Sequence, residues 1–310
     1  MKVLVTGGAG FIGSNIVDLL IEKNYEVCVI DSLIHGKRSN INPKAKFYEV
    51  DIRDKKVIEV FDEYRPDFVV HNAAQISVSN SVKDPVNDAD INIMGTINIL
   101  EAAKKCNVKK IIYPASAAIF GEPVYLPIDE KHPLDMISGY GVSKHTVEHY
   151  LKVYKSLNNI DYVSLRYSNV YGPRQDSSGE GGVVAIFCEK MLNDESPFIY
   201  GDGEQIRDFV FVEDVAKANL LAIESNANGI MNICTNNKVT VNDLFETIRN
   251  VLGKDIKATY TSEREGDIKN SYMTYKKAKD SLGWQPETTI EEGLRKTIEY
   301  YKGIKQDNNN

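Results

Sequence analysis

Cysteine is scarce in this chain, and its few copies lie far apart. The 310 residues include four cysteines and five histidines. The cysteines are Cys28, Cys106, Cys188 and Cys234. None forms the Cys-x-x-Cys spacing that is typical of zinc ribbons and redox pairs. We therefore expect reduced cysteines in the core and no metal site.

Long apolar runs and an excess of positive charge are missing as well. No stretch approaches the roughly 18 apolar residues that cross a bilayer, and the first apolar run is only a strand without a signal-peptide cleavage pattern. The net charge of -7 and the pI of about 5.4 give no general attraction to nucleic acid or to an anionic membrane. These absences predict a cytoplasmic protein that binds neither, in which individual arginines hold any anionic ligand.

The composition that remains is that of a folded α/β protein. Hydrophobic residues make up 42% and charged residues 26% of the chain, enough for one large or two moderate domains. Strand and helix patterns alternate through the first half, and such alternation builds a parallel sheet covered on both faces. After the first two strands, the expected strands are 46–50, 68–71, 110–115 and 162–166, and the expected helices are 55–64, 89–105 and 140–156. We predict a Rossmann-type, doubly wound parallel sheet.

The alternation of expected strands and helices becomes less regular after residue 170. Glycine-rich turn signals stand at 171–174, 177–182 and 201–203. The elements expected here are helices near 183–192, 213–224, 241–252 and 290–302 and strands near 197–200 and 208–212. We predict that residues 1–170 form the sheet domain, that segments such as 208–235 return to it, and that 171–310 mainly form a smaller, interleaved α/β substrate-binding lobe. The asparagines at 308–310 are expected to be a frayed tail.

A glycine-rich turn joins the first expected strand to a helix. Gly7, Gly10 and Gly13 fit the widely spaced dinucleotide fingerprint, and a tighter variant starts from Gly8. In both, glycine lets the backbone approach a pyrophosphate whose charge then lies at the helix N-terminus. Asp31 ends the second strand about 20 residues further on, where a carboxylate binds the adenosine ribose and repels a 2′-phosphate. This arrangement predicts NAD rather than NADP.

A second motif stands near the middle of the chain. Tyr140 and Lys144 are four residues apart in an expected helix, so their side chains point the same way. A fixed ammonium stabilises a nearby tyrosinate, and a phenol with a lowered pKa can act as a general base on a sugar hydroxyl. The residues at or just past the ends of expected strands are Asp51, Ala73, Ala74 and Ser116. Because ligands bind outside the carboxyl ends of parallel strands, these residues are expected to line one crevice.

Many further segments occur in an order that is typical of one family. They are Thr6-Gly7-Gly8-Ala9-Gly10-Phe11-Ile12-Gly13, Asp51-Ile52, His71-Asn72-Ala73-Ala74-Gln75, Asn92 with Gly95-Thr96, Ser116-Ala117-Ala118-Ile119-Phe120-Gly121, Tyr140 with Lys144, Arg166 to Gln175, Tyr200-Gly201-Asp202-Gly203, Arg207-Asp208-Phe209 and Arg264-Glu265-Gly266-Asp267. Over nearly its whole length the chain resembles the extended short-chain dehydrogenases/reductases, and among them the UDP-hexose 4-epimerases that act on UDP-glucose or UDP-N-acetylglucosamine.

The resemblance implies a site with NAD as cofactor and a UDP-sugar as substrate. The implied catalytic residues are Ser116, Tyr140 and Lys144. The implied cofactor contacts are Gly7, Gly10, Phe11, Ile12, Gly13, Asp31, Asp51, Ile52, Ala73, Ala74, Asn92, Tyr140, Lys144 and Tyr167. The implied substrate contacts are Ser116, Asn169, Val183, Tyr200, Arg207, Arg264, Asp267 and Ser271. Related enzymes also imply a homodimer formed through the helices at 89–105 and 140–156.

The residues after Ser116 bear on which reaction the fold performs. Related dehydratases and decarboxylases resemble one another in placing an acid there, whereas this chain has Ala117 and Ala118, which cannot transfer a proton. C4 epimerisation through a 4-keto sugar is therefore favoured. A UDP-glucuronate 4-epimerase and a non-catalytic NAD-sensing protein remain alternatives.

Alignment with the family places Ser271 where epimerases restricted to plain hexoses carry an aromatic wall. A small residue there predicts acceptance of UDP-GlcNAc and UDP-GalNAc, with UDP-Glc and UDP-Gal as further substrates. The neighbouring Tyr272 leaves a second reading open, because a shift of one residue would restore the aromatic wall. Ser168 and Phe120 depart from the common family pattern without removing a catalytic group.

Overall fold

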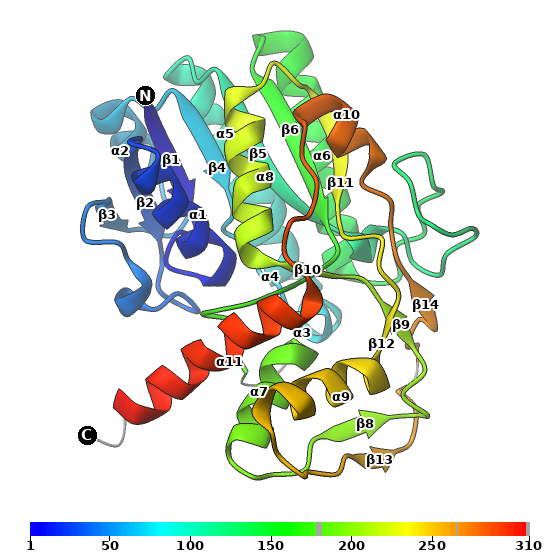
Figure 1. The fold of residues 1–310 in the computed structure, drawn as a ribbon. Helices are drawn as coiled ribbons and strands as arrows, with labels where there is room; N and C mark the ends of the chain where they lie inside the picture. The colour runs from blue at the N-terminus through cyan, green and yellow to red at the C-terminus, as the bar shows by residue number, and fades with distance from the viewer. Residues whose placement is uncertain (178–181, 265, 308–310) are drawn as a thin grey trace.

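A seven-stranded parallel sheet organises the computed structural model, which describes residues 1–177, 182–264 and 266–307 (Figure 1). Its strand order is β11-β6-β5-β4-β1-β2-β3. The strands are β1 Lys2–Thr6, β2 Glu26–Asp31, β3 Lys46–Glu49, β4 Phe68–His71, β5 Lys110–Ser116, β6 Asp161–Tyr167 and β11 Gly229–Ile233. The order reverses beside β1, since β2 and β3 extend one way from it and β4 to β6 the other. The predicted doubly wound α/β fold is confirmed.

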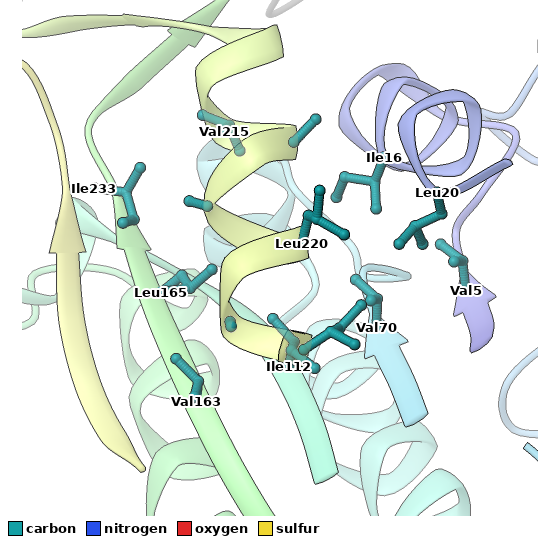
Figure 2. Packing of buried hydrophobic residues seen from close by; sticks show 14 of the residues in the cluster. Val5, Ile16, Leu20, Val70, Ile112, Val163, Leu165, Val215, Leu220 and Ile233 are labelled. Carbon is teal, nitrogen blue, oxygen red and sulfur yellow. The ribbon is translucent and has the colours of Figure 1, made fainter. Parts of the chain in front are cut away.

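Helices cover both faces of this sheet because alternate residues of each strand point to opposite sides. Val3 and Val5 of β1 belong to one buried cluster and Leu4 to the other. The first cluster packs under α1 (Phe11–Glu22), α8 (Val212–Glu224) and α10 (Lys276–Leu282), and Figure 2 shows α1 and α8 directing Ile16, Leu20, Val215 and Leu220 into it. The second cluster packs under α2 (Lys56–Tyr64), α5 (Gly95–Lys105) and α6 (Gly139–Asn158). The central strands are thus buried on both faces, whereas the edge strand β3 is partly exposed.

The helix expected at 89–105 differs from the structure. The chain forms α3 (Val78–Lys83), then α4 (Pro85–Ala89), then a π-helical turn, η2 (Asp90–Met94), and only then α5. Ser77 and Asp84 start the two short helices by accepting hydrogen bonds from the backbone N–H groups of Asn80 and Asn87. π-turns are rare and concentrate at functional sites.

A smaller group of elements lies beside the sheet (Figure 1). Its helices are α7 Val183–Leu192, α9 Val241–Leu252 and α11 Ile290–Asp307, which share one buried cluster. Its strands pair as β8 Phe198–Tyr200 with β13 Thr259–Thr261, β7 Asn169–Tyr171 with β10 Phe209–Phe211, and β12 Val239–Thr240, β9 Ile206–Arg207 and β14 Asn270–Ser271 together. Short 3-10 turns stand at η1 Arg38–Asn40 and η3 Ala117–Ile119.

Most expected elements in this half match within a few residues, and α7 and α9 have the predicted bounds. Helix α11 continues past the predicted end at 302. The elements that were not predicted are α10 and the strands β7, β9, β11, β12, β13 and β14. The predicted turn at 177–182 falls largely on residues outside the described ones, as do Glu265 and the tail at 308–310. Within the described ranges, no helix is long and apolar enough to cross a membrane.

The one tryptophan of the chain joins α10 to α8. Trp284 is fully buried, and its Nε1 donates to the Asp214 carbonyl oxygen at 2.9 Å. Its ring meets the edge of Tyr275 at a centroid distance of 6.0 Å. The indole is therefore part of the buried cluster beneath α8.

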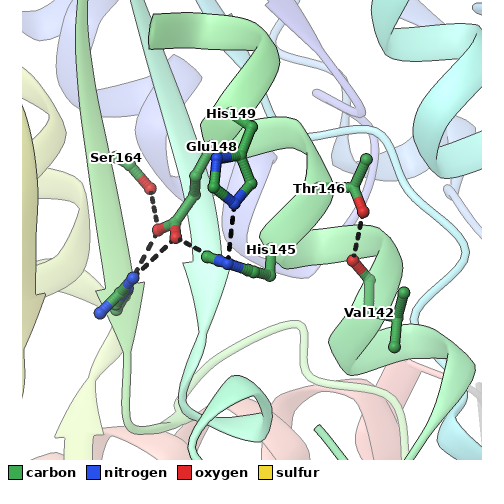
Figure 3. A network of polar contacts seen from close by, with 7 residues as sticks. Val142, His145, Thr146, Glu148, His149 and Ser164 are labelled. Atoms are coloured by element: carbon green, nitrogen blue, oxygen red, sulfur yellow. Dashed lines mark hydrogen bonds and ion pairs between the residues drawn. The ribbon is translucent and has the colours of Figure 1, made fainter. Parts of the chain in front are cut away.

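A buried ion pair fastens α6 to β6 (Figure 3). Glu148 and Arg166 are 2% and 3% exposed, and two nearly parallel hydrogen bonds of 2.7 and 3.0 Å join them. Ser164 Oγ donates to the same carboxylate at 2.8 Å, and His145 Nδ1 lies 3.0 Å from it. Burial raises the pKa of Glu148, but the hydrogen bonds with His145 and Arg166 outweigh it, so the net pKa is lowered.

We expect Glu148→Gln to lower the free energy of unfolding at pH 7 by about 3 kcal/mol, because it leaves the Arg166 guanidinium buried without its counter-charge. A carboxyl whose pKa is lowered by folding contributes stability above its unfolded pKa and loses it as the pH falls through the folded one. The gap between wild type and variant in urea denaturation should therefore narrow on acidification. Glu291→Gln, which breaks an exposed pair with Arg295, is the control and should change stability by less than about 0.5 kcal/mol. Equal losses for the two variants would contradict this account.

Candidate active site

Close backbone contacts shape the glycine turn between β1 and α1. A Cβ added to Gly13 would lie 2.1 Å from the Gly7 carbonyl oxygen, and one added to Gly7 would lie 2.7 Å from the Ala73 nitrogen. Gly10 stands at the start of α1 and provides no side-chain cap. The first backbone N–H groups of this helix are therefore free of a side-chain acceptor and suited to an anion. The turn forms a tight cradle, in which a side chain at Gly7 or Gly13 would clash with the backbone.

Asp31 holds this cradle against the end of β2. Its two carboxylate oxygens accept from the backbone N–H groups of Ala9 at 2.9 Å and Leu33 at 2.8 Å, and the residue is 7% exposed. Asp31 therefore orients the turn as well as standing where the sequence predicts a ribose contact.

The neighbouring strand ends carry the other predicted cofactor residues. Asp51 follows β3 and pairs with Arg53 at 2.7 Å, a partner that was not predicted. Ile52 is buried beneath Gly95, where an added Cβ would lie 2.7 Å from its Cδ1. Ala73 follows β4, and its N–H donates to the Thr6 hydroxyl at 3.1 Å.

The three predicted catalytic residues come from the end of β5 and the start of α6. Ser116 is the last residue of β5; its hydroxyl accepts from the Ala118 N–H at 3.2 Å and lies near enough to Tyr140 to lower the pKa of that phenol. Ser138 caps α6 through the Gly141 N–H at 3.1 Å, which fixes the first turn that carries Tyr140. One turn later, Lys144 Nζ donates to the Pro114 carbonyl oxygen at 2.9 Å and lies 5.9 Å from the Tyr140 ring centroid. The structure thus brings the three together.

Burial dominates the protonation of this group. It raises the pKa of Tyr140 to about 12, against the lowering effect of the nearby Ser116 hydroxyl and with a smaller raising effect of the Asp88 charge. It lowers the pKa of Lys144 to about 8, which the Asp88 charge partly offsets. Desolvation of the phenolate therefore dominates the Tyr140 pKa, and any charge that favours the tyrosinate must outweigh it.

Ser116 and Tyr140 open into a cavity of about 330 Å³. Its lining brings together seven predicted residues: Phe11, Ile12, Ser116, Tyr140, Tyr167, Asn169 and Val183. It also includes residues that were not predicted, namely Ile76, Ala115, Ser168, Val170, Gln175, Gly182, Val184 and Phe209. Ser168, Val170, Gln175 and Phe209 lie in segments that the resemblance had singled out, whereas Ile76, Ala115, Gly182 and Val184 carry no such signal and are placed by the fold.

A second hollow, of about 120 Å³, gathers other predicted substrate residues. Tyr200, Arg264 and Asp267 line it, and the Arg264 guanidinium carbon lies 3.9 Å from the Tyr200 ring centroid. Arg207 pairs with Asp267 at 2.5 Å. This ion pair was not predicted, because the two residues are 60 positions apart.

The orientation of Ser271 follows from strand register. Ser271 of β14 pairs with Arg207 of β9, so both side chains point to the same face of this small sheet. Tyr272 points to the other face, where its ring lies 4.7 Å from Lys238 Nζ. Ser271, and not Tyr272, therefore shares a face with Arg207.

One histidine pair was not among the predictions. His145 and His149 are four residues apart on α6, and their Nε2 atoms are 3.0 Å apart (Figure 3). The spacing is visible in the sequence and occurs in metal sites. Throughout the described ranges, however, no group of three or more His, Cys, Asp or Glu side chains is placed to hold a metal ion.

Comparison with known proteins agrees with this geometry. The family model described as "NAD dependent epimerase/dehydratase family" matches residues 3–234. A relative from Methanocaldococcus jannaschii, provisionally named a UDP-glucose 4-epimerase, is 52% identical over 301 residues, which are 97% of this chain and 98% of that protein.

Two solved structures are similar over almost the whole chain. The UDP-glucose 4-epimerase of Thermotoga maritima, solved with UDP-glucose, has a TM-score of 0.96 and 47% identity and covers 98% of this chain and 99% of its own. The UDP-N-acetylglucosamine 4-epimerase of Methanobrevibacter ruminantium, solved with UDP-N-acetylmuramic acid, has a TM-score of 0.94 and 39% identity and covers 98% of each chain. The protein described here belongs to the NAD dependent epimerase/dehydratase family.

Proposed function

We propose that this protein uses NAD to interconvert the C4 epimers of UDP-hexoses, and that it accepts the 2-acetamido pair UDP-GlcNAc and UDP-GalNAc as well as UDP-Glc and UDP-Gal. The observation that carries this proposal is the cavity around Ser116 and Tyr140. No carboxyl side chain is found among its described lining residues. Ala117 and Ala118, which follow the serine in η3, add none. Elimination of water, and other reactions that need a further acidic side chain, thus have no such proton donor among the described residues that line the cavity.

The residues around the glycine turn fit NAD. The glycines at 7 and 13 allow the close backbone packing that the turn of a pyrophosphate site needs, and Asp31 at the end of β2 suits a ribose without a 2′-phosphate. Lys144 would hold the nicotinamide ribose from α6. When bound, oxidised NAD supplies the hydride acceptor for the sugar C4 and a positive charge that adds to that of Lys144.

Tyr140 is the proposed base. Its hydroxyl and that of Ser116 face one cavity, so a sugar 4-hydroxyl between them can pass its proton to Tyr140 directly or through Ser116. Because burial raises the Tyr140 pKa to about 12, proton loss near neutral pH needs the combined positive charges named above. The same proton returns to the sugar oxygen after the 4-keto intermediate has presented its other face. The net change is inversion at C4.

We expect Tyr140→Phe to reduce turnover of UDP-Glc and UDP-GlcNAc about a thousandfold, because the ring remains and only the proton acceptor is lost. Chromatographic separation of the epimers after incubation measures this loss. Tyr150→Phe makes the same change at a half-buried position of α6 and should leave turnover within about twofold. Near-wild-type turnover by the Tyr140 variant would refute the proposed mechanism. A fully inactive wild type would instead favour the NAD-sensing alternative.

The proposed nucleotide clamp lies at the second hollow. Arg264 and Arg207 are the cations we assign to the diphosphate, because a guanidinium makes planar, two-point contacts with phosphate. Asp267, which orients Arg207 in the structure, is assigned to the uridine ribose. On this proposal, residues 1–170 with the returning segment 208–235 bind the cofactor, and 171–310 mainly bind the nucleotide sugar.

Two observations bear on the sugar. Ser271 shares a face with Arg207 while Tyr272 points away, which supports the small gatekeeper and the space for a 2-N-acetyl group. No lysine, arginine or histidine is among the described residues that line the cavity, which disfavours the carboxylate of UDP-glucuronate.

Ser271→Tyr should reduce kcat/KM for the acetylated pair at least about tenfold more than for the plain pair, since the added ring occupies the space of the acetyl group. Product analysis with each substrate alone gives the two values. Tyr272→Ser, on the opposite face, is the control and should leave the ratio unchanged. A shift in the ratio with the Tyr272 variant alone would mean that the alignment is displaced by one residue.

We also propose a homodimer formed through η2, α5 and α6. Val142, Val153 and Leu157 lie along one stripe of α6 and are 46%, 47% and 77% exposed, and Met94 on η2 is 56% exposed. Leu157→Glu should convert a dimer into a monomer in sedimentation analysis, while Leu157→Met should not. A monomeric wild type would overturn this part of the proposal.

A further inference from the structure

A buried acid lies close to the catalytic residues without touching the cavity. Asp88 on α4 is 2% exposed, and its Oδ1 accepts from Gln75 Nε2 at 2.8 Å and from Asn92 Nδ2 at 3.1 Å. Both donors are neutral amides, and no ion pair between described residues includes Asp88. A buried carboxylate without a cation in contact is costly to maintain. Groups around Asp88 must therefore compensate for the cost of burying a carboxylate there.

Asn92 connects this acid to α6. The π-turn η2 carries Asn92, whose Nδ2 also approaches the Ser143 hydroxyl at 3.0 Å. Asn92 Oδ1 accepts from the Gln75 N–H at 2.7 Å, which fixes the amide orientation. Asp88, Asn92 and Ser143 form a short hydrogen-bonded chain. Because Ser143 immediately precedes Lys144, this chain leads from the acid to the residue next to the catalytic lysine.

Among the described residues, Lys144 has no carboxylate in ion-pair contact. Lys144 is 4% exposed, and its Nζ lies 4.9 Å from the Tyr113 ring centroid and 5.9 Å from that of Tyr140. Both phenols are neutral, because burial raises the pKa of each. His71, on the adjacent strand β4, has its pKa lowered to about 3 by burial and by the Lys144 charge, and is neutral too. Glu148, one turn further along α6, is paired with Arg166. The Asp88 charge acts on the ammonium and favours its protonated form.

We propose that Asp88 is a positioning residue of the catalytic pair: its buried carboxylate holds the Gln75–Asn92–Ser143 chain against α6 and supplies the negative charge that keeps the Lys144 ammonium protonated. This inference rests on the proposed function, in which Lys144 must carry its charge for Tyr140 to lose a proton. The same negative charge also opposes the tyrosinate. Asp88 thus moves the titrations of both residues to higher pH.

The test is the titration of Lys144 in Asp88→Asn, a change that keeps the shape and removes the charge. In the purified protein labelled with [13Cε]lysine, the Lys144 resonance is assigned from its loss in Lys144→Met and followed from pH 6 to 10. We expect its midpoint to fall by about one pH unit in Asp88→Asn. In kcat/KM for a UDP-hexose, the acid limb from Tyr140 and the alkaline limb from Lys144 should both move to lower pH.

The control is Asp84→Asn, which removes an exposed charge at the start of the same helix and keeps a good capping residue. It should leave both titrations unchanged. Asp88→Glu should keep the Lys144 midpoint near the wild-type value even where packing lowers activity, which a purely structural role for Asp88 does not predict. Asp88→Ser is a second uncharged variant, to be used if the asparagine variant does not fold.

An unchanged Lys144 midpoint in a folded, uncharged variant would overturn the inference. The resonance needs no turnover, so the two proposals can fail separately. A shifted midpoint in a protein that converts no UDP-hexose would uphold Asp88 and refute the proposed function. If the wild type converts a UDP-hexose and the Lys144 midpoint is unchanged in Asp88→Asn, the proposed function stands and the role of Asp88 is refuted.

Discussion

Burial of the Lys144 ammonium is the constraint around which this site is built. Burial of Lys144, which is 4% exposed, favours loss of its proton and lowers its pKa to about 8, even though the Asp88 charge acts in the opposite direction. The Pro114 carbonyl, the faces of two tyrosine rings and the Asp88 carboxylate together accommodate it. Pro114 and Tyr113 lie on β5, Tyr140 on α6 and Asp88 on α4, so these three elements must be correctly placed for the charge to persist.

The sequence predicted those parts of the fold whose signals are local. The strand β4, the helices α7 and α9, and the glycine turn follow from hydrophobic period and glycine spacing, and the structure has them where expected. The break of the 89–105 helix into α4, η2 and α5 was missed, because it depends on the inward hydrogen bonds of Asn92 to a distant loop. Ser77 and Asp84, each followed by a helix, were signals that could have revealed the short helices.

For the candidate site, too, local motifs were predictable from the sequence and long-range contacts were not. Ser116, Tyr140 and Lys144 come together as their motifs predict, whereas the roles assigned to individual contacts remain proposals. The raised Tyr140 pKa and the partnership of Arg207 with Asp267 could not be predicted, since both arise from long-range burial and packing. The choice between Ser271 and Tyr272 needed strand register, because side chains alternate faces and a shift of one residue reverses the answer.

Trp284 gives the molecule an unusually simple optical property. Since it is the single indole of the chain and is fully buried, the intrinsic indole fluorescence comes from one dry position between α10 and α8. That position lies in the cluster that also contains α1, on the sheet face opposite to α6. A red shift of the emission therefore marks water entering beneath α8 and not a rearrangement at the Lys144 side of the sheet. Fluorescence can thus follow the loosening of one layer of the fold independently of the other.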